Sequence, residues 1–241
     1  MMKPLPKTGD NPAMTDPDQT DLTSDLPQTL PIFPLSGFLI FPGDETQLNI
    51  FEPRYLAMVE DALAGDKMIG MIQPHADDNE GKGRVYDIGC AVTIDEAQST
   101  PDGRLLIWIR GISRFKVVEE LESMRGYRRV QTCWKTYPAD PELARKAEDP
   151  SDDGVSRDGF VDALDKYADA KGMELNRDAL HAAPLRRVVH AVAMASDLSV
   201  AEKQAILEAE TLASQTDLIQ AMLEMAVLGR HGDDGKPTGL A

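Results

Sequence analysis

Ser113 and Lys116 are spaced in a way that suggests chemistry, because a serine nucleophile and a lysine three positions apart occur in some serine hydrolases. That arrangement requires a helix, on which residues three apart share a face. The surrounding residues 104–121, RLLIWIRGISRFKVVEEL, are instead typical of a long β-strand. On a strand the two side chains point to opposite faces. We therefore expect no nucleophilic catalysis from this pair.

Metal and nucleotide chemistry also lack their usual residue patterns. The four histidines share no zinc-ligand spacing; they are His75, His181, His190 and His231. Residues 149–154 resemble a calcium loop only faintly, without its alternating ligands or closing glutamate. Residues 235–238 are the nearest match to a phosphate-binding loop, but they contain Pro237 and lie in a polar tail. We predict no metal, no cofactor and no enzymatic activity.

A basic cluster between Arg110 and Arg129 supports the alternative function, RNA binding. Its members are Arg110, Arg114, Lys116, Arg125, Arg128 and Arg129. Tyr127 and Trp134 offer aromatic rings of the kind on which unpaired bases stack. The competing interpretation is that these cations form ion pairs with acidic residues nearby, namely Glu119, Glu120 and Glu122. We favour the ion pairs, because the net charge of −16 repels nucleic acid.

The composition narrows the remaining possibilities. With 241 residues the chain fits one large domain or two small ones. Its acidity disfavours DNA and anionic membranes as partners, and no apolar run approaches the roughly 18 residues of a membrane span. The first residues lack the apolar core of a secretory signal, which predicts a cytoplasmic protein. Cys90 and Cys133 lie in apolar stretches, so we expect free, buried thiols.

Residues 29–138 are mostly typical of β-strands. Short apolar runs alternate with turn signals, of which residues 101–103, Pro-Asp-Gly, are the strongest. Gly89 marks an expected bulge, and Gly111 marks an expected break in the longest strand. One helix interrupts the strands, beginning at Pro53 and ending at Gly65 as its C-cap.

Helical spacing dominates residues 139–229, where four helices joined by short loops predict a small bundle. The residues that define them are, in order, Phe160, Leu164 and Tyr167; Leu185, Val188, Val189 and Val192; the cap Ser199 to Glu202 with Ile206; and the cap Ser214 to Asp217 with Leu218, Met222 and Met225. Strands followed by helices indicate the α+β class. Residues 1–28 and 230–241 are polar and are expected to be disordered tails.

Seven segments, taken in order, resemble the N-terminal domain of Lon proteases, especially small stand-alone bacterial members of that family. They are residues 30–35, 41–43, 50–55, 88–91, 102–103, 111–115 and 198–204. The resemblance implies a six-stranded PUA-like pseudo-barrel with one helix over 29–138, followed by a helical bundle over 139–229. The residues that match the family motifs, and for which a structural role is expected, are Pro42, Gly43, Glu52, Pro53, Arg54, Tyr55, Gly89, Gly111 and Arg114.

The same resemblance implies a function in recognition. The family engages unfolded or tagged polypeptides and docks on partner proteins, so we expect a non-catalytic polypeptide-binding module or an adaptor in protein quality control. The sequence has no segment that matches the ATPase or peptidase domains of Lon. The oligomeric state stays open between a monomer and a weak dimer.

Four of the six phenylalanines lie within 19 residues, at Phe33, Phe38, Phe41 and Phe51. Most should belong to the core, but one or two exposed beside Pro34 and Pro42 would form an apolar patch for an extended peptide. This patch is the predicted peptide-binding site. The neighbouring Glu52, Arg54 and Tyr55 are expected to form a structural ion pair and not a chemical triad.

Overall fold

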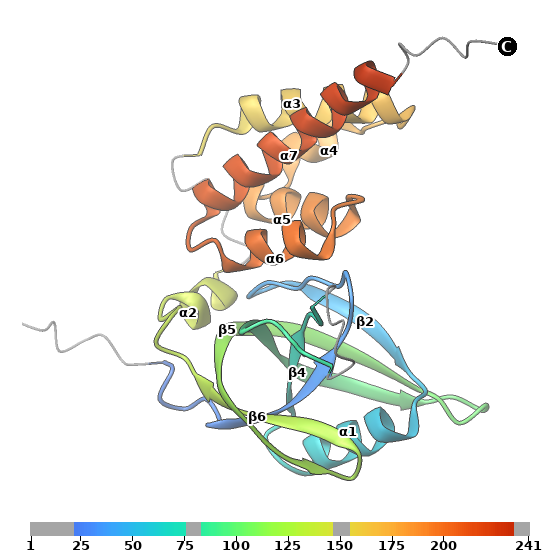
Figure 1. Ribbon diagram of the computed structural model, residues 1–241, viewed down its shortest axis with the longest axis vertical. Helices are drawn as coiled ribbons and strands as arrows, with labels where there is room; N and C mark the ends of the chain where they lie inside the picture. Colours follow the sequence, from blue (N-terminus) through green and yellow to red (C-terminus); the bar gives the residue numbers. More distant parts are fainter. Residues whose placement is uncertain (1–21, 76–82, 147–154, 234–241) are drawn as a thin grey trace, which may run out of the picture.

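The computed structural model describes residues 22–75, 83–146 and 155–233, where every helix except α1 follows the last strand (Figure 1). The strands are β1 (Thr29–Pro34), β2 (Glu45–Ile50), β3 (Met68–Ile72), β4 (Ile88–Ser99), β5 (Leu105–Met124) and β6 (Tyr127–Cys133). The helices are α1 (Pro53–Ala64), α2 (Asp140–Arg145), α3 (Arg157–Lys171), α4 (Arg177–Ala182), α5 (Leu185–Ala195), α6 (Val200–Glu208) and α7 (Leu212–Asp233).

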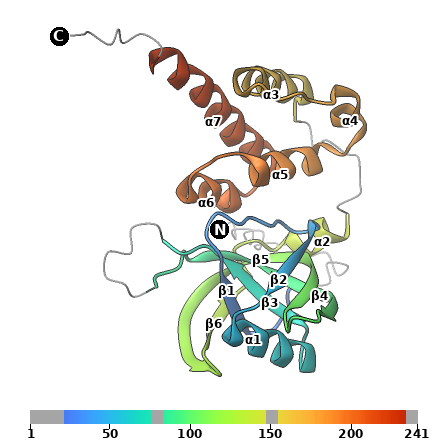
Figure 2. The same ribbon diagram turned by 90° about the vertical axis from the view of Figure 1, so that its right-hand side faces the viewer.

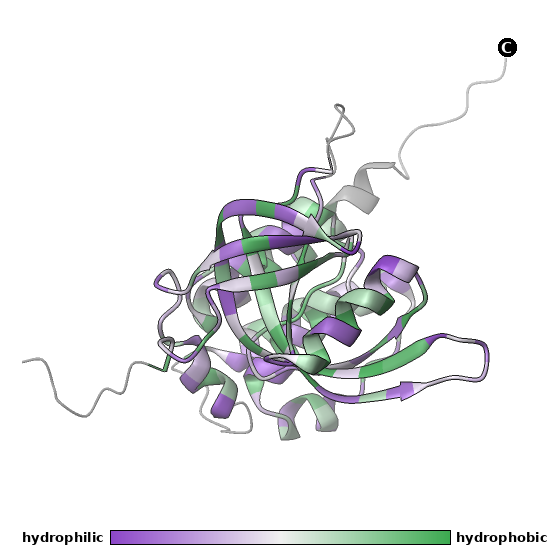
Figure 3. Cartoon of the chain, turned by 90° about the horizontal axis from the view of Figure 1, so that it is seen from below, coloured by the Kyte–Doolittle hydropathy of each residue, from purple (hydrophilic) through white to green (hydrophobic). Residues whose placement is uncertain are grey.

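The strands form one sheet that closes into a barrel, because the 20-residue β5 has different neighbours along its length. The sheet order is β2-β5-β4-β3-β1-β6, and a further pairing joins β6 back to β5. Only the β1–β3 pairing is parallel among these strands. Hydrophobic and hydrophilic residues alternate along several strands (Figure 3), as expected when one face of each strand is buried.

The barrel interior is organised around the fully buried ring of Phe115. A Cβ atom at Gly70 would lie 2.8 Å from this ring, and one at Gly89 would lie 2.7 Å from it. Gly89 therefore provides space for a core side chain. The predicted bulge at Gly89 is wrong: the register of β4 against β5 shifts between Ala91 and Val92 and again further along.

A second core lies between the outside of the barrel, α1 and the later helices. Pro53 begins α1 as predicted, and Gly65 is its C-cap, although Gly65 does not adopt the left-handed conformation. The buried Tyr55 of α1 packs on Phe33 of β1 with ring centroids 4.2 Å apart. This contact fixes α1 against the strands.

The prediction of the helix opened by Ser199 is confirmed, and the prediction of the last helix needs correction. The capping box Ser199 to Glu202 is present at the start of α6, but α7 begins at Leu212, because Thr211 accepts a hydrogen bond from the backbone of Ser214 at 3.1 Å. Of the predicted inner residues, Leu218 and Met222 are half-buried against the core, whereas Met225 is 71% exposed. Ile219 and Leu223 of the same helix are fully buried.

Both predicted tail boundaries lie inside regular or hydrogen-bonded structure. The carbonyl of Pro27 accepts hydrogen bonds from the Thr132 hydroxyl at 2.9 Å and the Trp134 indole at 3.1 Å. The backbone N–H of Thr132 also donates to Gln28. At the other end, α7 continues to Asp233, beyond the expected limit at residue 229.

Candidate functional site

Next to the later helices, residues 41–44 cross strand β5 at Gly111, and only glycine at this position permits the close approach. A Cβ atom on Gly111 would collide with the carbonyl oxygen of Phe41. Gly43 donates to the Gly111 carbonyl at 2.9 Å, and Gly111 donates to the Asp44 carbonyl at 2.9 Å. Strand β5 is continuous here, so the predicted break is instead a bulge with Ile112 as the extra residue. The crossing fixes Phe41 and Asp44 against the barrel.

Those two residues hold α5 through His190, which is buried. A carboxylate oxygen of Asp44 lies 3.0 Å from Nδ1 of His190, and Gln215 Oε1 lies 3.3 Å from Nε2. The ring of Phe41 stacks on the imidazole with centroids 4.1 Å apart. The barrel loop, α5 and α7 therefore meet at one histidine.

Arg114 provides the second connection, and its side chain is only 4% exposed. Its guanidinium donates to both carboxylate oxygens of Asp140 at 2.8 Å and to the Leu207 carbonyl at 3.0 Å. It also lies 3.8 Å from the centroid of the Tyr137 ring. A bidentate pair of this kind is specific in geometry, so Arg114 orients α2 and the end of α6 relative to β5.

Polar side chains of α6 complete the contact. Lys203 donates to the carbonyls of Gly37 and Met194 at 3.1 Å. Gln204 donates to the Ile88 carbonyl at 3.0 Å. We call the set Asp44, Arg114, Asp140, His190, Lys203 and Gln204 the polar junction. Buried polar groups that are all hydrogen-bonded specify one arrangement of the elements they join.

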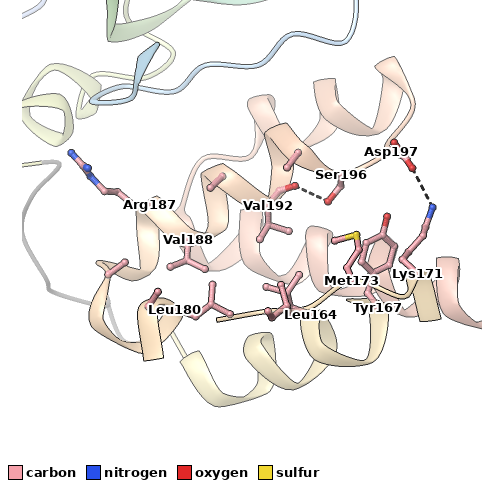
Figure 4. Close-up of a pocket in the computed structure, with 15 residues that line it drawn as sticks. Leu164, Tyr167, Lys171, Met173, Leu180, Arg187, Val188, Val192, Ser196 and Asp197 are labelled. Carbon is pink, nitrogen blue, oxygen red and sulfur yellow. Dashed lines mark hydrogen bonds and ion pairs between the residues drawn. The ribbon is translucent and has the colours of Figure 1, made fainter. Parts of the chain in front are cut away.

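The opposite side of α5 forms a cavity of about 590 Å³ between α3, α4 and α5, which we call the α3–α5 groove (Figure 4). Its apolar lining consists of Leu164, Tyr167, Met173, Leu175, Ala179, Leu180, Ala183, Val188, Ala191, Val192 and Ala195. The volume lies within the range of about 300–1,000 Å³ that is typical of ligand sites. This is the candidate functional site.

The polar residues of the groove have partners that keep them out of its interior. Lys171 pairs with Asp197 at 3.2 Å at one end, and Arg187 extends away at the other (Figure 4). The hydroxyl of Ser196 donates to the Val192 carbonyl at 2.6 Å. The groove therefore offers apolar contact and no arrangement of groups for acid–base or nucleophilic catalysis.

One wall of the groove, α4, has no fully buried residue, although Leu180 packs partly buried against the core. Arg157 donates to the carbonyls of Leu180 and Ala183, both at 2.8 Å. Arg177 forms an ion pair with Asp165 at 2.6 Å. Polar contacts at both ends and the packing of Leu180 therefore hold this helix.

The predicted phenylalanine patch is not assembled on the surface. Phe41 is fully enclosed and Phe33 is buried, Phe38 is half-buried against the core, and Phe51 is 63% exposed. Phe51 is therefore the one of the four that is largely exposed. The groove was missed in the sequence because three elements contribute to it and four of its lining residues are alanines.

The predicted structural motif divides between the two ends of the barrel. Pro42, Gly43, Gly111 and Arg114 belong to the crossing and the polar junction. Glu52 and Arg54 form an exposed ion pair at 2.8 Å, next to the buried Tyr55. This agrees with the structural interpretation of Glu52, Arg54 and Tyr55.

The basic cluster consists largely of ion pairs, although mostly with other partners than predicted. Arg110 pairs with Asp95 at 2.9 Å and Arg128 with Glu120 at 2.6 Å. Arg125 pairs with the α1 residue Glu60 at 2.7 Å. With Arg114 buried in the polar junction and three of the others in ion pairs, this arrangement does not favour RNA binding.

The two residues considered for nucleophilic catalysis differ in their surroundings. Ser113 is fully buried and its hydroxyl donates to the Arg114 carbonyl at 3.1 Å, whereas Lys116 is exposed. Within residues 22–75, 83–146 and 155–233, no three His, Cys, Asp or Glu side chains converge on a metal position. The calcium-like and phosphate-loop-like segments lie outside these residues, and the side chain of His231 is not described.

Both cysteines are free thiols, as predicted. Cys90 is buried, and burial raises the pKa of its thiol well above the ordinary value, which disfavours the thiolate. Cys133 is only half-buried. None of the helices in the described part of the chain is long and apolar enough to span a membrane.

Comparison with known proteins places this chain in a family. Residues 29–225 match the family described as the ATP-dependent protease La (LON) substrate-binding domain, and the chain belongs to that family. It is 27% identical over 191 residues to the Lon protease of Dictyoglomus thermophilum, covering 77% of this chain and 23% of that protein. It is 25% identical over 212 residues to Lon protease 2 of Myxococcus xanthus, covering 83% of this chain and 24% of that protein. The chain thus spans about a quarter of these relatives.

Two solved structures have a similar fold. The Lon N-terminal domain protein from Xanthomonas campestris gives a TM-score of 0.54 at 22% identity, covering 80% of this chain and 97% of that one. The N-terminal domain of the Mycobacterium avium complex Lon protease gives a TM-score of 0.54 at 12% identity, covering 81% and 98%. The similarity therefore includes both the barrel and most of the helices.

Proposed function

We propose that this chain is a recognition module that binds unfolded or extended polypeptide in the α3–α5 groove and performs no chemistry on it. The observation that supports this most directly is a groove of about 590 Å³ with an apolar interior, in a member of a substrate-binding family. Polypeptide that has lost its fold exposes apolar side chains, and burying them is the main driving force for association.

The polar junction supports the same proposal. It fixes α5 against the barrel through His190, and α5 supplies five of the residues that line the groove. One wall of the groove is thus fixed to the barrel. We further propose an adaptor role in protein quality control, in which the barrel supports the helices that form the groove.

The test uses alanines that are exposed and separated by one helical turn. Ala191 and Ala195 line the groove, and Ala201 and Ala205 occupy matching exposed positions on α6. Glutamine is a good helix former, so neither pair of substitutions should disturb folding. The ligand is a reduced, alkylated protein that cannot refold, and binding is measured by fluorescence anisotropy.

We expect Ala191→Gln with Ala195→Gln to weaken binding by about tenfold, because the new amides would be desolvated beneath the ligand. Ala201→Gln with Ala205→Gln should leave the affinity unchanged. The proposal fails if the wild-type chain does not bind the unfolded protein, or if both pairs of substitutions have the same effect.

A further inference from the structure

We propose that strand β2 is an interface at which a second copy of this chain pairs antiparallel with it, so that the sheet of one barrel continues into the other. This surface shares no residue with the α3–α5 groove, so its test is independent of the proposed function. Three observations support the pairing: the unpaired edge of β2, its lack of the charges found at other strand edges, and the self-complementary order of its residues.

Strand β2 is the end strand of the sheet, because it pairs with β5 and with no other strand of the described residues. Successive residues of an antiparallel strand direct their backbone N–H and C=O groups alternately toward and away from the neighbouring strand. Gly111 donates to the Asp44 carbonyl at 2.9 Å, so every second residue from Thr46 onward also faces β5. The residues between them direct their backbone groups away from β5; they are Glu45, Gln47 and Asn49.

These outward backbone groups have no hydrogen-bond partner in the described part of the chain. The three residues that carry them are all exposed. An open strand edge of this kind is a template on which another extended strand can pair. The edge of β2 is therefore available for a further strand.

Charge marks two other stretches of the barrel that have a neighbouring strand on one side only. Residues 95–99 of β4 extend beyond β3, begin with Asp95 and Glu96, and follow a register shift. The end of β5 carries three glutamates beyond its pairing with β4. Charges and bulges at an edge oppose pairing with another chain. Residues 46–50 of β2, TQLNI, contain neither a charge nor a proline, so β2 lacks this protection.

The sequence of β2 is complementary to itself when two copies pair antiparallel about Gln47. In that register Gln47 lies opposite Gln47 of the second copy, and Glu45 lies opposite Asn49. The outward N–H and C=O groups of both strands are then all paired. No charge faces a like charge between residues 45 and 49, and the Asn49 amide can donate to the Glu45 carboxylate. Such a two-fold contact closes at two copies, which favours a second copy over an unrelated segment.

The net charge of −16 opposes this contact, because two copies of the chain repel each other. Salt screens such repulsion. We therefore expect a weak dimer, whose dissociation constant falls as the salt concentration is raised.

The experiment measures self-association of the full chain by sedimentation equilibrium. Gln47→Lys and Gln47→Glu each place like charges opposite each other across the two-fold axis. Gln98→Lys is the matched control, because Gln98 is an exposed residue of β4. Both Gln98 and Asn49 pair with Leu106 of β5, so Gln98 lies on the same face of the sheet as the exposed residues of β2. Circular dichroism checks that each variant is folded.

We expect a monomer–dimer equilibrium for the wild type. Gln47→Lys and Gln47→Glu should each weaken the dimer about fivefold, whereas Gln98→Lys should leave it unchanged. An equimolar mixture of the Gln47→Lys and Gln47→Glu variants should associate more tightly than either variant alone, because opposite charges then face each other across the axis.

A wild-type chain that stays monomeric up to about 1 mM would overturn the proposed dimer. A dimer that Gln98→Lys weakens as much as Gln47→Lys would place the contact elsewhere, as would a mixture no tighter than its components. If the wild type is monomeric and the Gln47 variants lose affinity for the reduced, alkylated protein, the edge of β2 binds extended polypeptide and not a second copy.

Discussion

The two sides of α5 are built from opposite kinds of interaction. His190 faces the barrel, is buried, and has oxygen partners at both ring nitrogens. The next residue, Ala191, faces the groove and is exposed among apolar side chains. The polar groups of the polar junction are hydrogen-bonded to other residues of the same chain. The apolar side chains of the groove line an open space instead. A recognition module needs both, because an open apolar surface selects its ligand only if its walls are held in place.

The largest effect is expected from Arg114→Met, which breaks the polar junction. It leaves the carboxylate of Asp140, 2% exposed, without its bidentate partner. An uncompensated buried charge costs about 3–5 kcal/mol in the free energy of unfolding, measured by urea denaturation. The control is Arg110→Met, since the Arg110–Asp95 pair is exposed and should contribute at most about 1 kcal/mol. Similar losses in the free energy of unfolding for both variants would contradict this difference between the buried and the exposed ion pair.

The next largest effect is a difference in stability between alanine substitutions at two glycines, Gly111 and Gly159. Gly111→Ala should lower the free energy of unfolding by about 1–3 kcal/mol, because the added methyl group forces the Phe41 carbonyl away from β5. Gly159→Ala lies within α3, where the methyl group would meet no atom closer than 3.8 Å. It should raise stability by about 0.5–1 kcal/mol through helix propensity. Changes of the same sign would show that the crossing is not tightly packed.

The smallest effect concerns pH, at the end of the barrel away from the junction. Burial, followed by a hydrogen bond to Asp61, raises the pKa of Tyr127 to about 12. The native state therefore keeps this proton when the unfolded state has lost it, so the contribution is present below pH 10 and is lost as pH rises towards 12. Tyr127→Phe should reduce this decline in denaturation midpoints measured between pH 9 and 12. If stability falls equally with pH in wild type and Tyr127→Phe, titratable groups other than Tyr127 cause the fall.

Local patterns predicted the elements better than the contacts between them. The strands and α1 follow from period-two alternation, turn residues and Pro53, all of which act within a few residues. The pairing of His190 with Asp44 spans 146 positions, and a single histidine in an apolar stripe was its only local signal. Short α4 has no buried residue, so hydrophobic periodicity gave no indication of it.

The site was harder to predict than the fold for a physical reason. Concentrated phenylalanines suggested an exposed patch, but aromatic side chains contribute most when buried, and Phe33 and Phe41 pack the core. The groove depends instead on small residues, because Ala191 and Ala195 leave space beside α5 that larger side chains would fill. Such space is a property of the assembled helices and not of any one segment.

The central claim, that polypeptide binds in the α3–α5 groove, is tested most directly by hydrogen exchange of the full chain with and without the reduced, alkylated protein. We predict that protection on binding concentrates in residues 164–197, with the largest change in α4, and that β2 and α1 beside Phe51 are unaffected. Protection confined to the surroundings of Phe51, with unchanged exchange in α4, would contradict the account.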